Sequence, residues 1–381
     1  MIKQISTLFF EEPTIVFDRI FVTSACPLVS VVIPVFNQED HIERNLESLI
    51  CCITLSWELI IVNDASEDHT LRILEEWGAK LDDNQPLLTR VRIFTTFNQL
   101  FETRCDHFAF GIAQGKYLLE VQADMNIREI GFDRKLYNAL KLNSDLLMIS
   151  GRGTQTLAPI INDLKLSSRN FLVHTFISLI SLLKYPFINI YFETITKILS
   201  KNRSLKTQEH LTGNTTIKSK NLMKSIIVEG SFEDTKSAGL LGSFEGISFS
   251  DKILKENKIW ISQTVMRGPL LIDRLKYEMV GGLQNQVFFL GFDDHDLAFR
   301  GWRFFSLRCA FVPVGFESPI EMGSTRRIRS LKTKWRKFLF EMIFIKRVKK
   351  TALYNITEDD FQSLPNPEIR RLNIENYEQG Y

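Results

Sequence analysis

The chain lacks the features that mark several large classes of protein. Its 381 residues include only five cysteines, an odd number, and no C-x-x-C pair. Such a set makes neither a disulfide framework nor a zinc site, and it fits reduced thiols in a cytosolic protein better. The formal charge of only +2 is too small to indicate nucleic-acid binding by the whole surface. We therefore expect a cytoplasmic protein that binds no nucleic acid.

Long apolar runs and internal repeats are also missing. The densest apolar stretch, residues 171–192, is interrupted by His174, Lys184 and Pro186. Its longest unbroken run is about half of what spans a bilayer, which favours a core or interfacial helix over a transmembrane one. Residues 1–10 contain no long apolar segment of the kind that a secretory signal needs.

Strand and helix patterns alternate through the first 150 residues. With 44% hydrophobic residues, the chain can bury a full core. Short β-branched runs predict strands, and apolar residues at helical spacing predict helices between them. The expected strands cover 29–37, 58–62, 91–95, 117–121 and 146–150, and the expected helices include 39–52 and 70–78. This alternation predicts an α/β fold with a mostly parallel twisted sheet flanked by helices.

Two strand-and-turn units near the N-terminus are the most informative segments. They are Val29-Ser-Val-Val-Ile-Pro-Val-Phe-Asn37 and Glu58-Leu-Ile-Ile-Val-Asn-Asp-Ala-Ser-Glu-Asp-His-Thr70. Each is an apolar strand that ends in polar groups, so Asp64 should lie at the carboxyl edge of the sheet, where α/β proteins bind ligands. A carboxylate there can accept hydrogen bonds from a base or a ribose. The pattern indicates a nucleotide-handling enzyme.

Three acidic segments fall at the ends of predicted elements. They are Asp64, the turn Asp124-Met-Asn126, and the run Asp293-Asp294-His295-Asp296. Each alone is weak evidence of function, because acidic side chains at helix starts are ordinary caps that suit the positive end of a helix. Together they are more specific, since the carboxyl ends of parallel strands face one crevice.

The chain resembles the family 2 inverting glycosyltransferases of the GT-A fold in four blocks taken in order. Val31-Val-Ile-Pro-Val-Phe-Asn37 followed by Glu39 is similar to the opening strand, and Asn63-Asp-Ala-Ser-Glu-Asp-His-Thr70 to the second block. Gln122-Ala-Asp-Met-Asn126 is similar to the DxD block, and Phe292-Asp-Asp-His-Asp-Leu297 to the ED block before a helix. The resemblance spans residues 29–318.

The resemblance implies a site with a base and a divalent cation. Asp294 would take the acceptor proton, with Asp293 beside it, and Asp296 would support the helix. Asp124 would hold Mg²⁺ or Mn²⁺, ions that suit oxygen ligands. The chain departs from the family at Asn126, which brings an amide oxygen but no charge, and it has no histidine after His295. Metal dependence is therefore left open.

The resemblance also implies donor and acceptor contacts. Candidate residues for the nucleotide sugar are Pro34, Phe36, Asn37, Glu39, Asp64, Asp106 and Asp124. Arg104 lies near Asp106, but the spacing back from Gly115 favours Asp106. Candidate residues for the acceptor are Gly268, Pro269 and Gly282.

The predicted domain organisation follows the same blocks. Residues 1–27 form an N-terminal extension, and 28–320 form the glycosyltransferase domain, made of a nucleotide-sugar half (28–150), a variable insert (151–265) and an acceptor half (266–320). Residues 321–381 form a C-terminal helical extension.

Within that extension, residues 326–350 are basic and amphipathic. Eleven Lys or Arg residues against one acid, Glu341, are interleaved with apolar residues at helical spacing. Such a helix either packs on the domain or docks on an anionic membrane surface, which would make the protein peripheral at the inner face of the membrane.

The predicted function is transfer of one sugar, of the hexosyltransferase type, from a nucleotide sugar to a hydroxyl of a glycan or lipid-linked acceptor. The Gln-x-x-Arg-Trp motif of processive synthases is absent, which favours single additions during synthesis of a surface polysaccharide. A sugar-phosphate nucleotidylyltransferase would need a Gly-rich phosphate loop after the first strand, and Phe36-Asn-Gln-Glu-Asp40 is not one. A non-catalytic nucleotide-sugar or glycan-binding protein on the same scaffold is the remaining alternative, and the intact Asp293-Asp294 pair opposes it.

Overall fold

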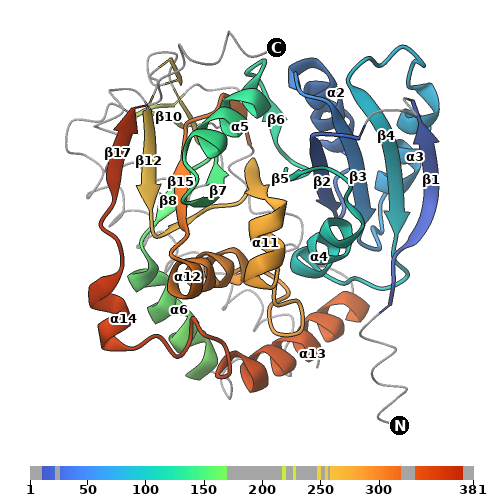
Figure 1. Cartoon of the computed structure of the whole chain (residues 1–381). Helices are drawn as coiled ribbons and strands as arrows, with labels where there is room; N and C mark the ends of the chain where they lie inside the picture. The colour runs from blue at the N-terminus through green and yellow to red at the C-terminus, as the bar shows by residue number, and fades with distance from the viewer. Residues whose placement is uncertain are drawn as a thin grey trace.

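A ten-stranded sheet forms the centre of the molecule (Figure 1). The computed structural model describes residues 11–21, 26–169, 217–219, 226–228, 247–249, 254–255, 258–318 and 331–371. Along the sheet the strands are β1 (Thr14–Ile20), β4 (Leu88–Thr95), β3 (Trp57–Asn63), β2 (Val29–Val35), β5 (Tyr117–Glu120), β14 (Leu270–Asp273), β7 (Leu146–Ser150), β15 (Arg308–Phe311), β12 (Lys258–Ser262) and β17 (Glu368–Arg371). The apolar segment 171–192 lies outside the described residues.

Most strands of this sheet run in one direction. β4, β3, β2 and β5 are parallel neighbours, and β7 and β15 are parallel to each other. β14 is antiparallel to both β5 and β7, so it joins these two groups with the same orientation. β1 and β12 are antiparallel to their neighbours. The predicted mostly parallel α/β sheet is confirmed.

Smaller sheets accompany the large one. β6 (Asn126–Ile127) pairs with β16 (Phe316–Glu317), and β8 (Thr154–Gln155) pairs with β13 (Thr264–Val265). β9 (Ile217–Ser219), β10 (Ile226–Val228) and β11 (Ile247–Phe249) form a three-stranded sheet.

Helices cover both faces of the large sheet. One hydrophobic core lies between the sheet and α2 (Ile42–Cys52), α3 (Thr70–Lys80) and α5 (Phe132–Leu142). A second core lies between the opposite face and α4 (Glu102–Ile112), α11 (Arg274–Val280) and α12 (Asp293–Phe305). β3 is buried along its whole length, with Leu59 and Ile61 in the first core and Ile60 in the second. Burial on both faces explains its continuous apolar sequence.

A third hydrophobic cluster lies beside the start of α12. It joins α6 (Leu157–Arg169) to α13 (Leu331–Val348) and to the segment that leads into α14 (Glu358–Ser363) and beyond it. In Figure 1, α13 runs along the bottom of the view, below α6 and α12. This cluster attaches the C-terminal part of the chain to the α/β sheet.

The face of α13 that is buried is not the one that its spacing predicts. Phe340 and Phe344 are buried against Phe101 and Phe288, whereas Trp335 is 47% exposed. Trp335 belongs to the apolar residues whose helical spacing predicts the amphipathic helix, which are Ile328, Leu331, Trp335, Phe338, Leu339, Met342 and Ile345. The buried side also includes two polar residues, Thr333 and Arg336. The helix faces inward through its aromatic residues because they meet aromatic partners, which a count of apolar residues does not reveal.

The sheet draws strands from both predicted extensions. β1, from residues 1–27, hydrogen-bonds to β4, and β17, from residues 321–381, hydrogen-bonds to β12. β12 itself comes from the predicted insert 151–265. The two edge strands, β1 and β17, carry charged side chains, as edges that must not pair with other chains often do. Neither strand has a buried residue, so a pattern of buried apolar positions does not mark β1 or β17 in the sequence.

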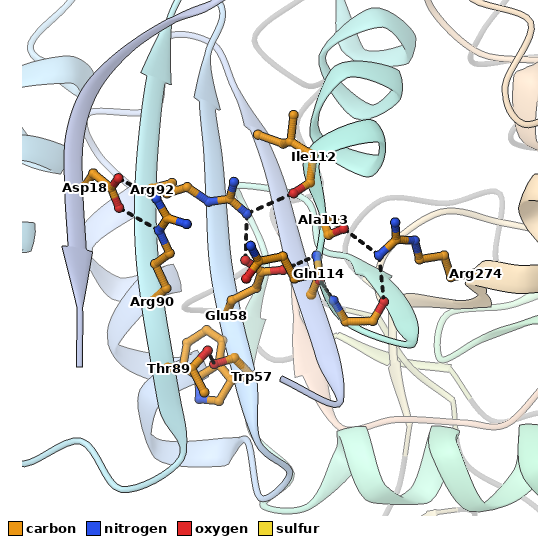
Figure 2. Close-up of polar contacts among 12 residues, drawn as sticks. Asp18, Trp57, Glu58, Thr89, Arg90, Arg92, Ile112, Ala113, Gln114 and Arg274 are labelled. Atoms are coloured by element: carbon orange, nitrogen blue, oxygen red, sulfur yellow. Dashed lines mark hydrogen bonds and ion pairs between the residues drawn. The ribbon is translucent and has the colours of Figure 1, made fainter. Parts of the chain in front are cut away.

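A buried ion pair ties three parallel strands to the end of α4 (Figure 2). Glu58 of β3 is fully buried, and one of its carboxylate oxygens accepts hydrogen bonds from Ser30 Oγ at 2.6 Å and from the Gln114 amide at 2.5 Å. The other oxygen accepts from Arg92 Nη2 at 2.7 Å, and Arg92 also donates to the Ile112 carbonyl at 3.1 Å. Both charges are removed from water, so each depends on the other.

We predict that Arg92→Met lowers the free energy of unfolding by about 3–5 kcal/mol, because it leaves the Glu58 carboxylate buried without a counter-charge. Urea unfolding of both proteins measures the difference. Adding Glu58→Gln to Arg92→Met should recover part of the loss, and an Arg92→Met protein as stable as the wild type would contradict the role of the pair.

Candidate functional site

Asp64 lies past the end of β3, as predicted, but its carboxylate points into the protein. It accepts hydrogen bonds from the backbone amides of Leu100 at 2.5 Å and Phe101 at 2.8 Å. The residue is 3% exposed, and burial raises the pKa of Asp64 to about 6. Asp64 therefore holds the loop between β4 and α4 in place at the sheet edge.

The loops that follow β2 and β3 are held to each other by side chains. Asn37 Oδ1 accepts a hydrogen bond from the Glu67 amide at 2.7 Å, and Glu39 Oε2 accepts from the His69 amide at 3.0 Å. Phe36 is buried, and Pro34 is half-buried at the end of β2. The predicted nucleotide-binding residues of this segment therefore shape the two loops.

The turn after β5 presents polar side chains at its surface. Gln122, Asp124 and Asn126 are partly exposed, whereas the apolar residues between them are buried. The side-chain amide of Asn45 donates to the carbonyls of Gln122 and Met125, at 3.0 and 2.5 Å, and fixes the turn. Of the two predicted cation ligands, Asp124 therefore lies on a turn that Asn45 fixes and Asn126 lies at the start of β6, and both residues are partly exposed.

Arg152, a residue that the sequence motifs do not single out, lies beside this turn. It follows β7, and its Nη1 atom donates to Gln122 Oε1 at 2.7 Å. Burial raises the pKa of Asp124, and the positive charge of Arg152 acts in the opposite direction. The sequence could have pointed to Arg152 only through its position just past a predicted parallel strand, where ligand-binding residues often lie.

The predicted acceptor motif Gly268-Pro269 packs against the same turn. A Cβ atom added to Gly268 would lie 2.8 Å from Met125 Sδ, and the backbone φ of +61° also favours glycine. The Gly268 amide donates to Glu120 Oε2 at 3.0 Å. A residue with a side chain would push the motif away from the turn that carries Asp124.

Gly282 lies elsewhere, at the junction of α11 and α12. Its carbonyl accepts from Arg300 Nη2 at 2.6 Å, and a Cβ atom there would lie 3.1 Å from the Tyr277 ring. The described contacts of Gly282 belong to helix packing. Gly268 and Pro269 thus meet the Asp124 turn through Met125, whereas Gly282 is packed against Arg300 and Tyr277.

The acidic run at the start of α12 separates into three different environments. Asp293 pairs with Arg267, and Asp296 accepts from Arg300 Nε at 2.7 Å. Asp294 Oδ1 accepts from the His295 amide at 2.9 Å, and its side chain is 9% exposed. The N-cap residue of α12 is Phe292, without a side-chain cap bond. Among the described ion pairs of these three acids, Asp294 is the one without an arginine.

Arg267 is the centre of a buried acidic cluster. Its Nη1 atom contacts Asp106 on α4 and its Nη2 atom contacts Asp293 on α12, and all three side chains are buried. Glu102 lies 3.4 Å from Nη1, and the charge of Glu120 also acts on the guanidinium. Asp106, a predicted nucleotide ligand, is therefore part of this cluster. The sequence signal for Arg267 was its place directly before Gly268-Pro269.

The cluster holds more carboxylates than one guanidinium can balance. Burial raises the pKa of Asp106 to about 7 and that of Asp293 to about 6, while the charge of Arg267 lowers both. Burial also raises the pKa of Glu120 well above its usual range. A charge removed from water is unfavourable unless it is paired, so these carboxyl groups take up protons at a higher pH than exposed carboxyl groups do.

The fold and the residues described above show which structural class the protein belongs to. The protein is an α/β protein whose mostly parallel sheet carries polar and acidic side chains past its strand ends, where proteins of this class bind ligands. The family described as "Glycosyl transferase family 2" matches residues 30–152. Within this segment, which contains most of β2, all of β3 to β7 and the Asp124 turn, the chain is similar to that family.

Curated relatives match the same part of the chain. An uncharacterized glycosyltransferase of Haemophilus influenzae is 31% identical over 32% of this chain and 35% of its own length. A putative teichuronic acid biosynthesis glycosyltransferase of Bacillus subtilis is 29% identical over 29% and 41%. A poly(ribitol-phosphate) beta-glucosyltransferase of Bacillus spizizenii is 35% identical over 33% and 20%. The chain thus spans less than half of the length of each of these relatives.

Two solved structures match a longer stretch of the chain at low similarity. A mannosyltransferase from Pyrobaculum calidifontis, in complex with GDP-Man and Mn²⁺, is 14% identical with a TM-score of 0.43, over 86% of this chain and 73% of that one. TarS residues 1–349 from S. aureus are 12% identical with a TM-score of 0.37, over 87% and 76%.

Two properties of the described residues bear on ligands and location. None of their helices combines the length and the apolar character that a bilayer crossing requires. In the same described ranges, His, Cys, Asp and Glu side chains form no group of three or more that could hold a metal ion.

We predict that ionisation of the carboxyl groups around Arg267 lowers the free energy of unfolding as pH rises from about 4 to about 7. The folded state binds protons at Asp106 and Asp293 more tightly than the unfolded chain does, so it gains stability below these raised pKa values and loses it as the groups ionise. The variant Asp106→Asn removes one such group and should show a smaller change over this range. Urea unfolding at a series of pH values measures it.

Asp82→Asn serves as the control, because Asp82 is exposed; this variant should follow the wild type. An equal pH dependence in the wild type and in Asp106→Asn would show that Asp106 binds no extra proton in the folded state.

Proposed function

We propose that the protein is an inverting glycosyltransferase that moves a single sugar from a nucleotide-sugar donor to a hydroxyl of an acceptor glycan. The proposal depends on one observation: the dipeptide Arg267-Gly268 contacts the neighbours of both Asp124, the predicted cation ligand, and Asp294, the predicted base. Gly268 packs on Met125, next to Asp124, and Arg267 holds Asp293, next to Asp294. The donor-side turn and the start of α12 therefore border the same small region.

Asp294 is the proposed general base. In the reaction the acceptor oxygen forms a bond to the anomeric carbon while the bond from that carbon to the diphosphate oxygen breaks. The proton of the acceptor hydroxyl passes to the Asp294 carboxylate, and the electron pair of the broken bond leaves with the nucleoside diphosphate. Asp293 is not available as the base, because Arg267 binds its carboxylate.

The Asp124 turn is the proposed cation site. One carboxylate and one amide oxygen are few ligands for an all-protein site, but they suit Mg²⁺ or Mn²⁺ that is also held by substrate phosphates. Such a cation, when bound, supplies positive charge to the departing diphosphate. Asp124 would bind it, Asn126 would contribute its carbonyl oxygen, and Asn45 fixes the backbone on both sides of Asp124, at Gln122 and Met125.

The donor nucleotide is proposed to bind over the loops after β2, β3 and β4. Asn37, Glu39 and Asp64 keep these loops in their observed shape through backbone amides, and Pro34 and Phe36 border them. A pre-formed site of this kind reduces the entropy that binding costs.

The acceptor is proposed to be a surface polysaccharide or a lipid-linked precursor. The names of the Bacillus relatives, which refer to teichuronic acid and poly(ribitol-phosphate), support this class. Gly268 and Pro269 would border the acceptor, next to Asp294. Docking of residues 326–350 on an anionic membrane stays a prediction, and packing accounts for the aromatic side of α13.

We expect Asp294→Asn to lower the rate of sugar transfer by about 10²- to 10⁴-fold, the usual contribution of a general base. Donor binding should be unchanged, since the substitution keeps the shape of the side chain. Release of nucleoside diphosphate from UDP-, GDP- and dTDP-sugars with candidate acceptors measures the rate, and calorimetry measures donor binding.

The exposed variant Asp82→Asn controls for nonspecific effects and should transfer at the wild-type rate. Transfer by Asp294→Asn at the wild-type rate would place the base elsewhere. A wild-type protein that binds a nucleotide sugar but transfers nothing to any acceptor would favour a binding protein instead.

We also expect Asn126→Asp to bind Mn²⁺ more tightly and Asp124→Asn to bind it more weakly, because each substitution changes the charge of the proposed ligand set by one. Mn²⁺ binding in the presence of a nucleoside diphosphate, followed by electron paramagnetic resonance, reports affinity without turnover. Equal Mn²⁺ affinity of the wild type and both variants would move the cation away from this turn.

A further inference from the structure

Arg267 connects the elements on which the proposed reaction depends. One terminal nitrogen contacts Asp106 in the second turn of α4, and the other contacts Asp293 in the first turn of α12. The next residue, Gly268, donates its amide to Glu120 and packs on Met125. A single stretch of chain thus touches α4, the start of α12 and the donor-side turn.

The buried carboxylates around Arg267 lower the stability of the folded protein, because several of their oxygens lack hydrogen-bond partners in the part of the chain that the structure describes. Asp106, Asp293 and Glu120 are almost completely buried, and among the described residues Asp106 Oδ1, Asp293 Oδ1 and Glu120 Oε1 have no hydrogen-bond partner. Burial of several carboxylates lowers stability unless each is paired, and apolar residues of similar size would stabilise the core more. Such a costly polar centre is typical of functional sites.

We propose that Arg267 is a positioning residue for the transfer step, an inference that rests on the proposed function. Its guanidinium clamps Asp106 and Asp293 together and so sets where the first turn of α12 lies relative to the donor-side turn. Asp294, the next residue after Asp293, then points its carboxylate to the acceptor hydroxyl. Arg267 itself contacts neither substrate in this arrangement.

The geometry needs a guanidinium rather than any positive charge. Arginine offers two terminal nitrogens in a rigid plane, and Arg267 uses one for each carboxylate. A lysine ammonium in the same place keeps the charge but cannot span the two acids with the same orientation. Arg267→Lys therefore separates the effect of charge from the effect of position.

We expect Arg267→Lys to lower kcat about 10- to 100-fold, since displacement of a reacting group by about 1 Å has effects of this size. The KM for the donor sugar should stay within about twofold of the wild type, because α12 and not the nucleotide loops would move. Steady-state transfer kinetics on the folded full-length protein give both values, with the preferred donor of the wild type.

Arg92→Lys is the matched control. Arg92 is also a buried arginine paired with a fully buried carboxylate, but it lies with Glu58 in the strands of the sheet and outside the site. The variant Arg92→Lys should lower thermal stability to a similar degree as Arg267→Lys does, while kcat per folded molecule stays unchanged.

Asp106→Asn provides a second variant if Arg267→Lys does not fold. It keeps an acceptor oxygen for Arg267 but weakens the α4 end of the clamp, and we expect about a 3- to 10-fold lower kcat, again a geometric effect, with an unchanged donor KM. A wild-type kcat in both variants would overturn the inference, as would a raised donor KM with kcat intact. Sugar transfer by the wild-type protein is measured first, because it tests the proposed function. A wild type that transfers no sugar would overturn both the proposed function and the inference about Arg267.

Discussion

The contact of Arg267 with Asp106 and Asp293 is the interaction on which the arrangement of the site depends. Asp294 lies in the first turn of helix α12, and Arg267 anchors the residue before it. The same segment of chain rests on the turn of Asp124 through Gly268. Because a guanidinium and its carboxylates are removed from water here, none of them can change partners without a large loss of free energy. The two halves of the proposed site are therefore held at a defined separation.

Polar side chains of the loops serve the same purpose on the nucleotide side. Asp64, Asn37 and Glu39 accept hydrogen bonds from backbone amides of neighbouring loops, which irregular segments cannot satisfy by themselves. α13 adds a further support, because Arg336 donates to the Gln99 carbonyl and Phe340 packs on Phe101. Residues whose types suggest ligand contacts thus build the walls of the site, and the C-terminal helix is one of its outer supports.

Predictions from sequence patterns are most accurate where periodicity and burial coincide. β2, β3, β5 and β7 occur within two residues of their predicted bounds, since continuous apolar runs have few other uses in a protein of this size. β1 and β17 are edge strands with one neighbour each and no buried residue, so burial and apolar pattern do not coincide in them. For α13 the spacing of apolar residues predicts the helix correctly but not the side of it that is buried. The buried side is set by contacts with the aromatic rings of Phe101 and Phe288, which are distant in sequence.

The sequence by itself determined the class of fold, the family segment and the positions of Asp64, Asp124 and Asp294 at element ends, because each of these depends on neighbours in the chain. Only the tertiary structure decided which carboxylates are paired. Asp293 and Asp294 are adjacent and identical in sequence, yet one is bound by an arginine that lies 26 positions away and the other is not. That difference arises from contacts between separate elements, which local spacing does not specify.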